Sequence, residues 1–279
     1  MRLAPSPLKL FSFCSVFISL VLTLSSAHAD TPGFNNLTQD DFDKAIRELS
    51  ANSSYHSVTG AGTLGDIFGF EVGIVGGITR TPDIDALSKN VNANADISRL
   101  PHASLLLAAS VPLGFTGELL LFPERTVSDV TYRQMGASVK WTATNVLMLP
   151  FNLAVRGFVT NNKMSFQQTL QNSSTGGTPV LVTINEENKQ TGLQLLASPN
   201  LPVLEPYAGI GVIKATGNLS VTGTGTIFAF TSSQSAESTP TSTQLLLGVN
   251  AHLLLLNMGV EYARAFGTDS FNLKLGLRF

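Results

Sequence analysis

Apolar and polar residues alternate strictly along many short stretches of this chain. The final stretch, Ser270–Phe279, shows the pattern most clearly. Its apolar members are Phe271, Leu273, Leu275, Leu277 and Phe279, and the residues between them are Asn272, Lys274, Gly276 and Arg278. Successive side chains of a β-strand point to opposite faces, so a period of two gives each set its own face. The pattern therefore predicts a strand with one apolar and one polar face.

Nine further stretches alternate in the same way, which gives ten predicted strands. They cover 68–78, 102–111, 115–122, 131–141, 151–159, 191–197, 206–212, 244–253 and 256–262. Polar connections are expected at 80–99, 123–128, 163–178, 222–241 and 266–269, and tight or apolar ones at 112–114, 143–149, 198–202 and near Leu254. The two kinds take turns along the chain. This order is typical of up-and-down outer-membrane barrels, with their longer loops on the outside.

The physical chemistry of a membrane requires such strands to close into a ring. A strand in lipid has no water to satisfy unpaired backbone amides, and only a closed barrel has no unpaired edge. We therefore predict an all-β fold over residues 67–279: a closed antiparallel up-and-down transmembrane β-barrel of about ten strands, within a range of eight to twelve. The alternative is a soluble β-sandwich. It would need a charge-rich polar face, whereas the polar positions here are mostly Gly, Ser, Asn and Gln.

Composition supports the membrane interpretation. Only 13% of residues are charged, and the mean hydropathy is +0.22, whereas soluble proteins average roughly 25% charged residues. Residues 1–29 are expected to be a signal peptide, with Arg2 and Lys9 before an apolar run and a cleavage site near Ala29; an uncleaved signal anchor is the alternative. The remaining chain has 15 cations against 19 acids and no cysteine. A net charge of −4 gives no electrostatic reason to expect nucleic-acid binding.

Residues 30–66 differ from the rest of the chain. Leu37–Ser50 is predicted to be a helix, with Thr38 as its N-cap and an apolar stripe made of Phe42, Ile46 and Leu49. A single helix of this length is marginal in water, so we expect the stripe to dock on the barrel. The segment would then be a plug in the lumen or a lid at the periplasmic mouth. A loose periplasmic segment is the alternative.

The polar faces of the predicted strands carry charges of both signs. The residues expected to line the lumen are Glu71, Glu118, Lys140, Arg156, Glu261, Lys274 and Arg278. They could form a salt-bridged interior that closes the barrel, or line a weakly selective pore. Side chains nearly fill the interior of a small barrel, so an open porin is not expected. Trp141, Tyr132, Tyr207 and Tyr262 are interpreted as aromatic residues at the membrane interface.

His102 and Ser104 are weak catalytic candidates on one strand face. They resemble the His-x-Ser pair of outer-membrane phospholipases and lipid A deacylases, in which His is the base for a Ser nucleophile. The phospholipase pattern continues with Asn-Gly after the Ser, and "PHASL" does not. Asp83 and Asp85 offer an acidic pair like that of omptin proteases, but the omptin motifs are absent. The simpler interpretation is that His102 and Ser104 are polar residues facing a wet lumen. We therefore predict that the protein is not an enzyme. No metal-ligand cluster, phosphate loop or nucleotide fingerprint is present, and no cofactor is expected.

Two stretches resemble those of bacterial outer-membrane β-barrel proteins. The C-terminal set Phe271, Leu273, Leu275, Leu277 and Phe279 is similar to the signal read by the barrel-assembly machinery, and "PYAGIGV" at 206–212 resembles a strand common in small barrels. The resemblance implies the outer membrane of a Gram-negative bacterium. It also implies the secretion translocon, the assembly machinery and outer-membrane lipids as partners.

The resemblance does not indicate a specific role, so three functions stay open. We favour a barrel that passes or binds a small solute across the outer membrane. A structural or adhesive surface barrel is the first alternative, with the Ser/Thr-rich stretches 172–179 and 231–243 as mobile extracellular loops. An outer-leaflet lipid hydrolase is the second alternative.

Overall fold

A computed structural model describes residues 39–65, 67–89, 96–127, 130–144, 149–171, 179–225 and 230–279. All of them belong to one compact unit, Thr31–Phe279. The predicted signal peptide and the predicted N-cap Thr38 lie outside the described residues. The described helices are α2 (Gln39–Asn52), α3 (Pro82–Lys89) and the 3-10 turn η1 (Pro112–Gly114). Neither α-helix in this part of the chain is long and apolar enough to cross a membrane.

The described strands form one antiparallel sheet that closes on itself. They are β1 (Gly69–Arg80), β2 (Arg99–Val111), β3 (Phe115–Val127), β4 (Val130–Thr142), β5 (Phe151–Gln171), β6 (Pro179–Pro199), β7 (Leu204–Gly225), β8 (Phe230–Ser238), β9 (Thr241–Leu253), β10 (Leu256–Ala265) and β11 (Thr268–Arg278). Strands that follow each other in sequence pair, except β8 with β9, and β1 also pairs with β11. β8 and β9 pair with β7 in one continuous register, from Gly217↔Ser238 to Lys214↔Thr241. They are interrupted at Pro240, which has no N–H to donate. The wall therefore consists of ten antiparallel strands, which confirms the predicted fold.

The outer surface of the barrel is apolar, as the alternation predicts. On β11, Phe271, Leu273 and Leu277 are half exposed while Asn272 and Lys274 are buried. The other strands repeat this arrangement. Between Phe271 and Phe279 the apolar face extends about 20 Å along the barrel axis, allowing for a tilt of roughly 40°. That height approaches the apolar band of outer-membrane barrels, about 25 Å.

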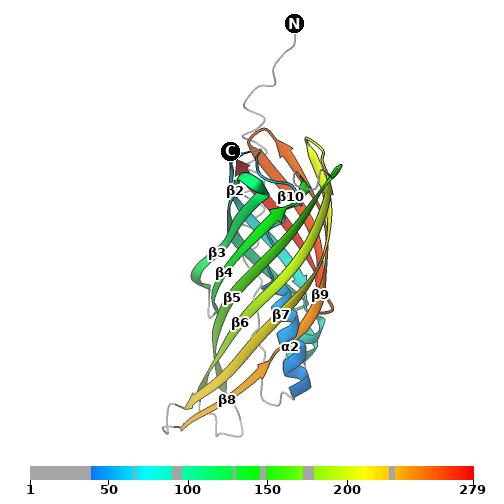
Figure 1. Cartoon of the computed structure of the whole chain (residues 1–279). Coiled ribbons are helices and arrows are strands. Elements are labelled where there is room, and N and C mark those ends of the chain that lie inside the picture. The colour runs from blue at the N-terminus through cyan, green and yellow to red at the C-terminus, as the bar shows by residue number, and fades with distance from the viewer. Residues whose placement is uncertain are drawn as a thin grey trace. The chain divides into compact units, whose positions relative to one another are not determined.

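The two ends of the barrel differ (Figure 1). At the proximal end, the main chains of Phe70 and Phe279 hydrogen-bond to each other, and short turns join β2 to β3, β6 to β7 and β9 to β10. At the distal end, β5, β6 and β7 run on for 21, 21 and 22 residues. These lengths exceed the 9–11 residues that a tilted strand needs to span a bilayer. The long hairpins therefore extend beyond the apolar surface.

Several expected connections are strands instead, and these expectations were wrong. β5 takes up 163–171, and β7 and β8 take up most of 222–241. The Ser/Thr-rich stretch 231–243 lies largely in β8 and β9, and β3 continues through 123–127. Polar residues can form strands when a hairpin partner pairs their amides, so polarity alone did not mark a loop. Residues 172–178 lie outside the described residues, and the connection at 80–99 contains the unforeseen helix α3.

Residues 39–65, here called the lumenal segment, pass through the interior of the barrel. Helix α2 lies at the distal end and contacts β7, β8, β11 and β1 (Figure 1). From Ser53 the chain is extended and buried until it reaches β1 at the proximal end. Phe42 and Ile46 of the predicted stripe are buried, and Leu49 packs against Ile84 and Ile97. Ile46 lies so close to Gly217 of β7 that a Cβ on the glycine would meet its side chain at 2.7 Å.

Candidate functional site in the lumen

All seven residues expected to line the lumen lie on the inner face of the wall. Six are at most 3% exposed, and Arg278 is partly buried near the proximal end. Four of them hydrogen-bond to the lumenal segment directly: Glu118, Lys140, Arg156 and Arg278. Burial of this many charges is tolerable only when each is paired and hydrogen-bonded. The partners of these charges therefore define the site.

Glu118 on β3 is the main acceptor of the network. Its carboxylate accepts hydrogen bonds from Tyr55 Oη at 3.0 Å, Thr59 Oγ1 at 2.9 Å and Ser138 Oγ at 3.1 Å. Arg156 Nη1 on β5 lies 3.5 Å from the same carboxylate. Tyr55 and Thr59 belong to the lumenal segment, and Ser138 and Arg156 belong to the wall. The carboxylate thus joins the segment to two different strands.

Arg156 and Lys140 supply the cations of the network. The Arg156 guanidinium donates to Gln194 of β6 and to the hydroxyls of Ser57 and Thr59, and it lies over the Tyr55 ring. Lys140 Nζ of β4 donates to the backbone carbonyls of Gly60 and Gly62 at 2.8 and 2.7 Å. Contacts to carbonyl oxygens depend on the path of the segment rather than on its side chains. Lys140 therefore fixes where the extended chain runs.

The proximal part of the segment is held by a second group of residues. Glu205 on β7 accepts hydrogen bonds from Gly62 N at 2.9 Å and from Ser198 Oγ at 2.6 Å. Arg278 donates to the carbonyl oxygens of Leu64 and Thr63 at 2.6 and 3.1 Å. Sequence reasoning missed Glu205. Its position two residues before inward-facing Tyr207 would have placed it on the inner face.

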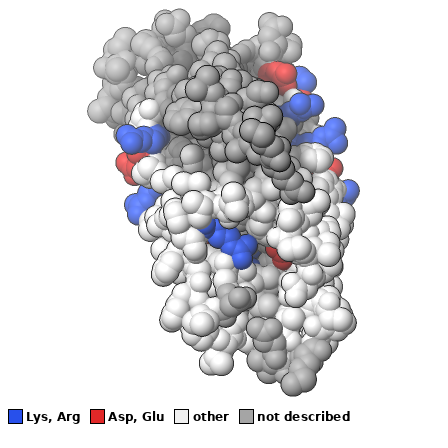
Figure 2. Space-filling model, turned by 90° about the horizontal axis from the view of Figure 1, so that it is seen from above, with Lys and Arg blue, Asp and Glu red and all other residues white. Residues whose placement is uncertain are grey.

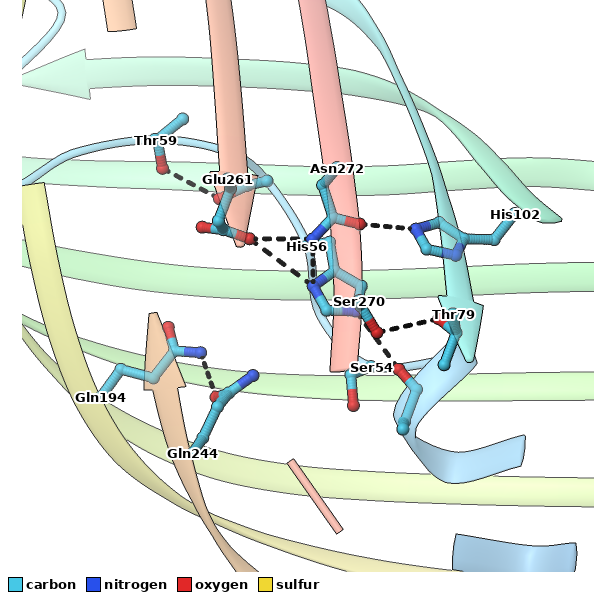
Figure 3. Close-up of polar contacts among 12 residues, drawn as sticks. Ser54, His56, Thr59, Thr79, His102, Gln194, Gln244, Glu261, Ser270 and Asn272 are labelled. Carbon is cyan, nitrogen blue, oxygen red and sulfur yellow. Dashed lines mark hydrogen bonds and ion pairs between the residues drawn. The ribbon is translucent and has the colours of Figure 1, made fainter. Parts of the chain in front are cut away.

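Two histidines and an asparagine make a cluster nearer the distal end (Figure 3). The rings of His56 and His102 stack with centroids 5.2 Å apart. Asn272 lies between them: its Oδ1 is 2.9 Å from His102 Nε2 and its Nδ2 is 3.2 Å from Glu261 Oε1. Tyr207 Oη donates to the other Glu261 oxygen at 2.9 Å. Tyr207 is therefore a lumenal residue, and its assignment to the membrane interface was wrong.

Amide side chains hold the junction between α2 and the extended stretch. Gln190 of β6 donates to the Ser50 carbonyl and to Ser53 Oγ, both at 2.9 Å, and Gln134 and Asn162 both donate to the Ser53 carbonyl at 3.2 Å. These amides were not expected to be site residues, because Gln and Asn are common on any polar face. Their inward position in the strand alternation was the only available signal.

Helix α2 is also joined to α3 at the distal end. The Glu48 carboxylate accepts hydrogen bonds from the backbone N–H groups of Asp83 and Ile84, both at 2.8 Å. It thereby satisfies donors that the first turn of α3 leaves free. Burial raises the pKa of Glu48 to about 7, although the two N–H bonds oppose the shift. Asp85, the other member of the acidic pair considered above, bonds to Ile97 N and Lys89.

His102 and Ser104 point inward but do not bond to each other. The ring nitrogens of His102 face Asn52 Oδ1 at 3.1 Å and Asn272 Oδ1 at 2.9 Å. Ser104 Oγ donates to the Ala103 carbonyl at 2.8 Å and to Gln134 Oε1 at 3.2 Å. The hydrogen bond by which a His base activates a Ser is therefore not formed here. Among the described residues, no three His, Cys, Asp or Glu side chains come together as a metal site.

The fold and the lumen together define the class of this protein. It is a closed ten-stranded barrel of the transmembrane type, with an apolar outer surface and a polar interior filled by its own lumenal segment. The chain belongs to a family of unknown function (DUF6588), whose model matches residues 8–279. No curated protein matches this sequence.

Solved structures of outer-membrane proteins are similar to this chain. The translocator domain of autotransporter NalP from Neisseria meningitidis has 10% identity and a TM-score of 0.42, and 86% of this chain and 95% of that chain are covered. The toluene transporter TodX of Pseudomonas putida has 10% identity, a TM-score of 0.36 and coverage of 89% and 98%. Ail, the attachment invasion locus protein of Yersinia pestis, has 10% identity, a TM-score of 0.29 and coverage of 77% and 100%.

Proposed function

We propose that the protein is an outer-membrane barrel that passes a small polar solute, and that the lumenal segment is its gate. The observation that carries the proposal is the chemistry of the contact between segment and wall. Glu118, Lys140, Arg156, Glu205 and Arg278 hold the segment through hydrogen bonds. Because water can replace each of these bonds, the net free energy that each contributes is limited to about 1.5–3 kcal/mol, the range for hydrogen bonds to charged groups. A segment held in this way can leave and return.

The wall residues suit the solute as well as the gate. Without the extended stretch 53–65, the same carboxylates, cations and amides would line a polar channel. The vacated space would have the cross-section of one extended peptide, about 5 by 10 Å from the spacing of strands and sheets. A channel of this size favours a small solute with hydrogen-bonding groups. Charges of both signs predict weak ion selectivity.

A reversible crosslink tests whether the lumenal segment is the gate. The contact of Ile46 with Gly217 suits a disulfide, because a Cβ on the glycine would lie 2.7 Å from Ile46 Cγ2 and bridged Cβ atoms are about 3.8 Å apart. The variant Ile46→Cys/Gly217→Cys has no competing thiol once the segment containing Cys14 is removed. In a planar bilayer we expect the oxidised variant to stay closed and the reduced variant to open. Each single-cysteine variant is the control and should ignore the oxidant.

A deletion separates transport from a purely structural role. The processed chain lacking residues 30–66 is expected to conduct continuously. The transport proposal fails if neither this deletion nor the reduced variant conducts or takes up solute. If the oxidised and reduced variants conduct equally, the segment is not the gate.

A structural or adhesive surface barrel is the second candidate, because β5, β6 and β7 extend beyond the apolar surface at the distal end. Such hairpins would present a polar, strand-paired surface outside the membrane. Shortening β5 and β6 at their tips would then abolish adhesion to a host cell or matrix and leave conductance unchanged. If the protein is a lipid hydrolase, the parent should hydrolyse a phospholipid and Ser104→Ala should abolish this activity. Absence of turnover by the parent, or unchanged turnover by the variant, would exclude the hydrolase hypothesis.

The proposed location is the outer membrane of a Gram-negative bacterium, with the proximal end in the periplasm. The outward row Phe271, Leu273, Leu275, Leu277 and Phe279 supports recognition by the barrel-assembly machinery, because the row is accessible on the edge strand before the ring closes. Cleavage near Ala29 and passage through the secretion translocon belong to the same proposal. Under this orientation α2 lies at the extracellular end of the barrel rather than at the periplasmic mouth.

A further inference from the structure

The outward-facing cations of the barrel wall all lie on one side of the apolar surface. Among the described residues, every Lys and Arg of a strand points into the lumen or lies in a ring around the distal end. The ring, here called the cation collar, has one member on each of seven strands and consists of Arg80, Arg99, Arg133, Lys163, Lys189, Lys214 and Arg264. All seven are exposed. Arg125 follows a register shift in β3 and pairs with Tyr132, so it lies on the inner face. The proximal half of the outer wall carries aromatic and aliphatic groups instead, such as Phe115 stacked on Trp141.

The collar follows directly on the apolar surface. On β1, β7 and β10 the cation is the next outward residue after the last apolar one, as in Ile78 to Arg80 and Val212 to Lys214. Members on neighbouring strands are also close in register: Arg80 pairs with Arg99, and Arg133 pairs with Lys163. Seen from above in Figure 2, the described surface is mostly uncharged, with Lys and Arg gathered at opposite edges and one group in the centre.

Few carboxylates neutralise the collar. Asp269 lies 3.9 Å from Arg80 and 3.5 Å from Arg264, and Glu187 lies 3.4 Å from Lys163 and 3.5 Å from Lys189. Two acids thus serve four cations, and half of that positive charge stays uncompensated. A row of long, solvated cations beside a hydrocarbon-facing surface is positioned at the depth of lipid headgroups.

We propose that the cation collar binds phosphorylated headgroups of anionic lipids in the leaflet at the distal end of the barrel. The acyl chains of these lipids would lie along the apolar wall while the phosphates contact the cations. Lys and Arg bind phosphate through charge-assisted hydrogen bonds, and each cation near an anionic membrane surface adds about a fivefold factor in affinity. The proposal rests on membrane embedding and is independent of whether the barrel transports a solute.

Lipid titration of the folded, detergent-solubilised chain tests the proposal. The probe is diphosphorylated lipid A, with its dephosphorylated form as the comparison and native mass spectrometry as the readout. The collar variant is Arg99→Gln/Arg133→Gln/Lys214→Gln on β2, β4 and β7, which leaves Asp269 and Glu187 with their partners. Its matched control is Lys44→Gln/Arg47→Gln/Lys89→Gln, which removes equal charge from the exposed faces of α2 and α3.

We expect the parent to bind the diphosphorylated form at least tenfold more tightly than the dephosphorylated form. The collar variant should lose about 100-fold in affinity, from a fivefold factor for each of three cations, and the control should change less than threefold. Raising the salt from 0.05 to 0.5 M should weaken parent binding, because solvated charges are screened.

Three results would overturn the proposal. They are equal binding of the two lipid forms, an equal loss in the control variant, and displacement of the lipid by millimolar inorganic phosphate, which would indicate a site for the free ion. Heat-dependent electrophoretic mobility shows whether each variant is folded. If the triple variant does not fold, the three single substitutions decide, each with an expected fivefold loss.

Discussion

Replacement of Arg156 by methionine is expected to destabilise the lumen more than the loss of any exposed cation. Arg156 is 1% exposed and faces the equally buried carboxylate of Glu118 at 3.5 Å. Methionine fills much of the same volume but leaves that carboxylate without its guanidinium partner. Removal of one member of a buried ion pair costs about 3–5 kcal/mol, because the remaining charge stays desolvated. The hydroxyls of Ser57 and Thr59 lose a donor in the same substitution.

A double-mutant cycle shows whether this cost comes from the unpaired charge. Glu118→Gln removes the charge but keeps one oxygen, which can accept from either Tyr55 or Thr59. We therefore expect Arg156→Met/Glu118→Gln to be less costly than the sum of the single substitutions, with a coupling free energy of about 1–3 kcal/mol. The matched control is Lys163→Met on the same strand, whose ion pair with Glu187 is 57% and 37% exposed. Pairs of this kind contribute about 0–1 kcal/mol.

The assay is reversible urea unfolding in zwitterionic lipid vesicles, followed by the fluorescence of Trp141, the single tryptophan of the chain. The free energy of unfolding of each variant is compared with that of the parent at one lipid concentration. The reasoning is refuted if Arg156→Met costs no more than Lys163→Met. Strict additivity of the two lumenal substitutions would also contradict it, since the charges would then not be coupled.

Two further predictions concern packing and membrane position. Gly248→Ala should lower the free energy of unfolding by about 1–3 kcal/mol, because the added Cβ would meet Tyr207 Cζ at 2.3 Å. Gly117→Ala on β3 is the control and should be close to neutral, because its Cβ would meet nothing within 4 Å. Equal Tm values for the two variants would contradict this prediction. Trp141 lies outward near the proximal end and donates to the Leu113 carbonyl, so lipids brominated near the headgroup should quench its fluorescence more than lipids brominated deep in the chain. Quenching by neither lipid would argue against membrane embedding.

The sequence predicted which wall residues face the candidate site, but not which residues of the lumenal segment they contact. Strand alternation alone assigned Glu118, Lys140 and Arg156 to the inner face, because the side to which a residue points is a local property of a strand. It could not find their partners. Tyr55 is 63 residues from Glu118, and Gly60 is 80 residues from Lys140. Only closure of the ring around the lumenal segment brings these groups together.

His102 and Ser104 illustrate the same limit. Their spacing puts both on one face, as the catalytic hypothesis requires. Their hydrogen-bond partners, however, are set by Asn272 on another strand and by Gln134 across the neighbouring one. Two residues on the same face of a strand can thus each hydrogen-bond to residues that are distant in sequence instead of to each other.

The sequence by itself determined the barrel, its apolar outer surface and the inward direction of its charges, because a period of two needs no information beyond the strand. It also predicted a helix that would need to dock, and the structure describes this helix as Gln39–Asn52. The tertiary structure decided that the long polar stretches continue as β5–β8, since their amides are satisfied only by partner strands. It also decided that 53–65 fills the lumen, because buried charges require partners and the lumenal segment is the part of the chain that supplies them.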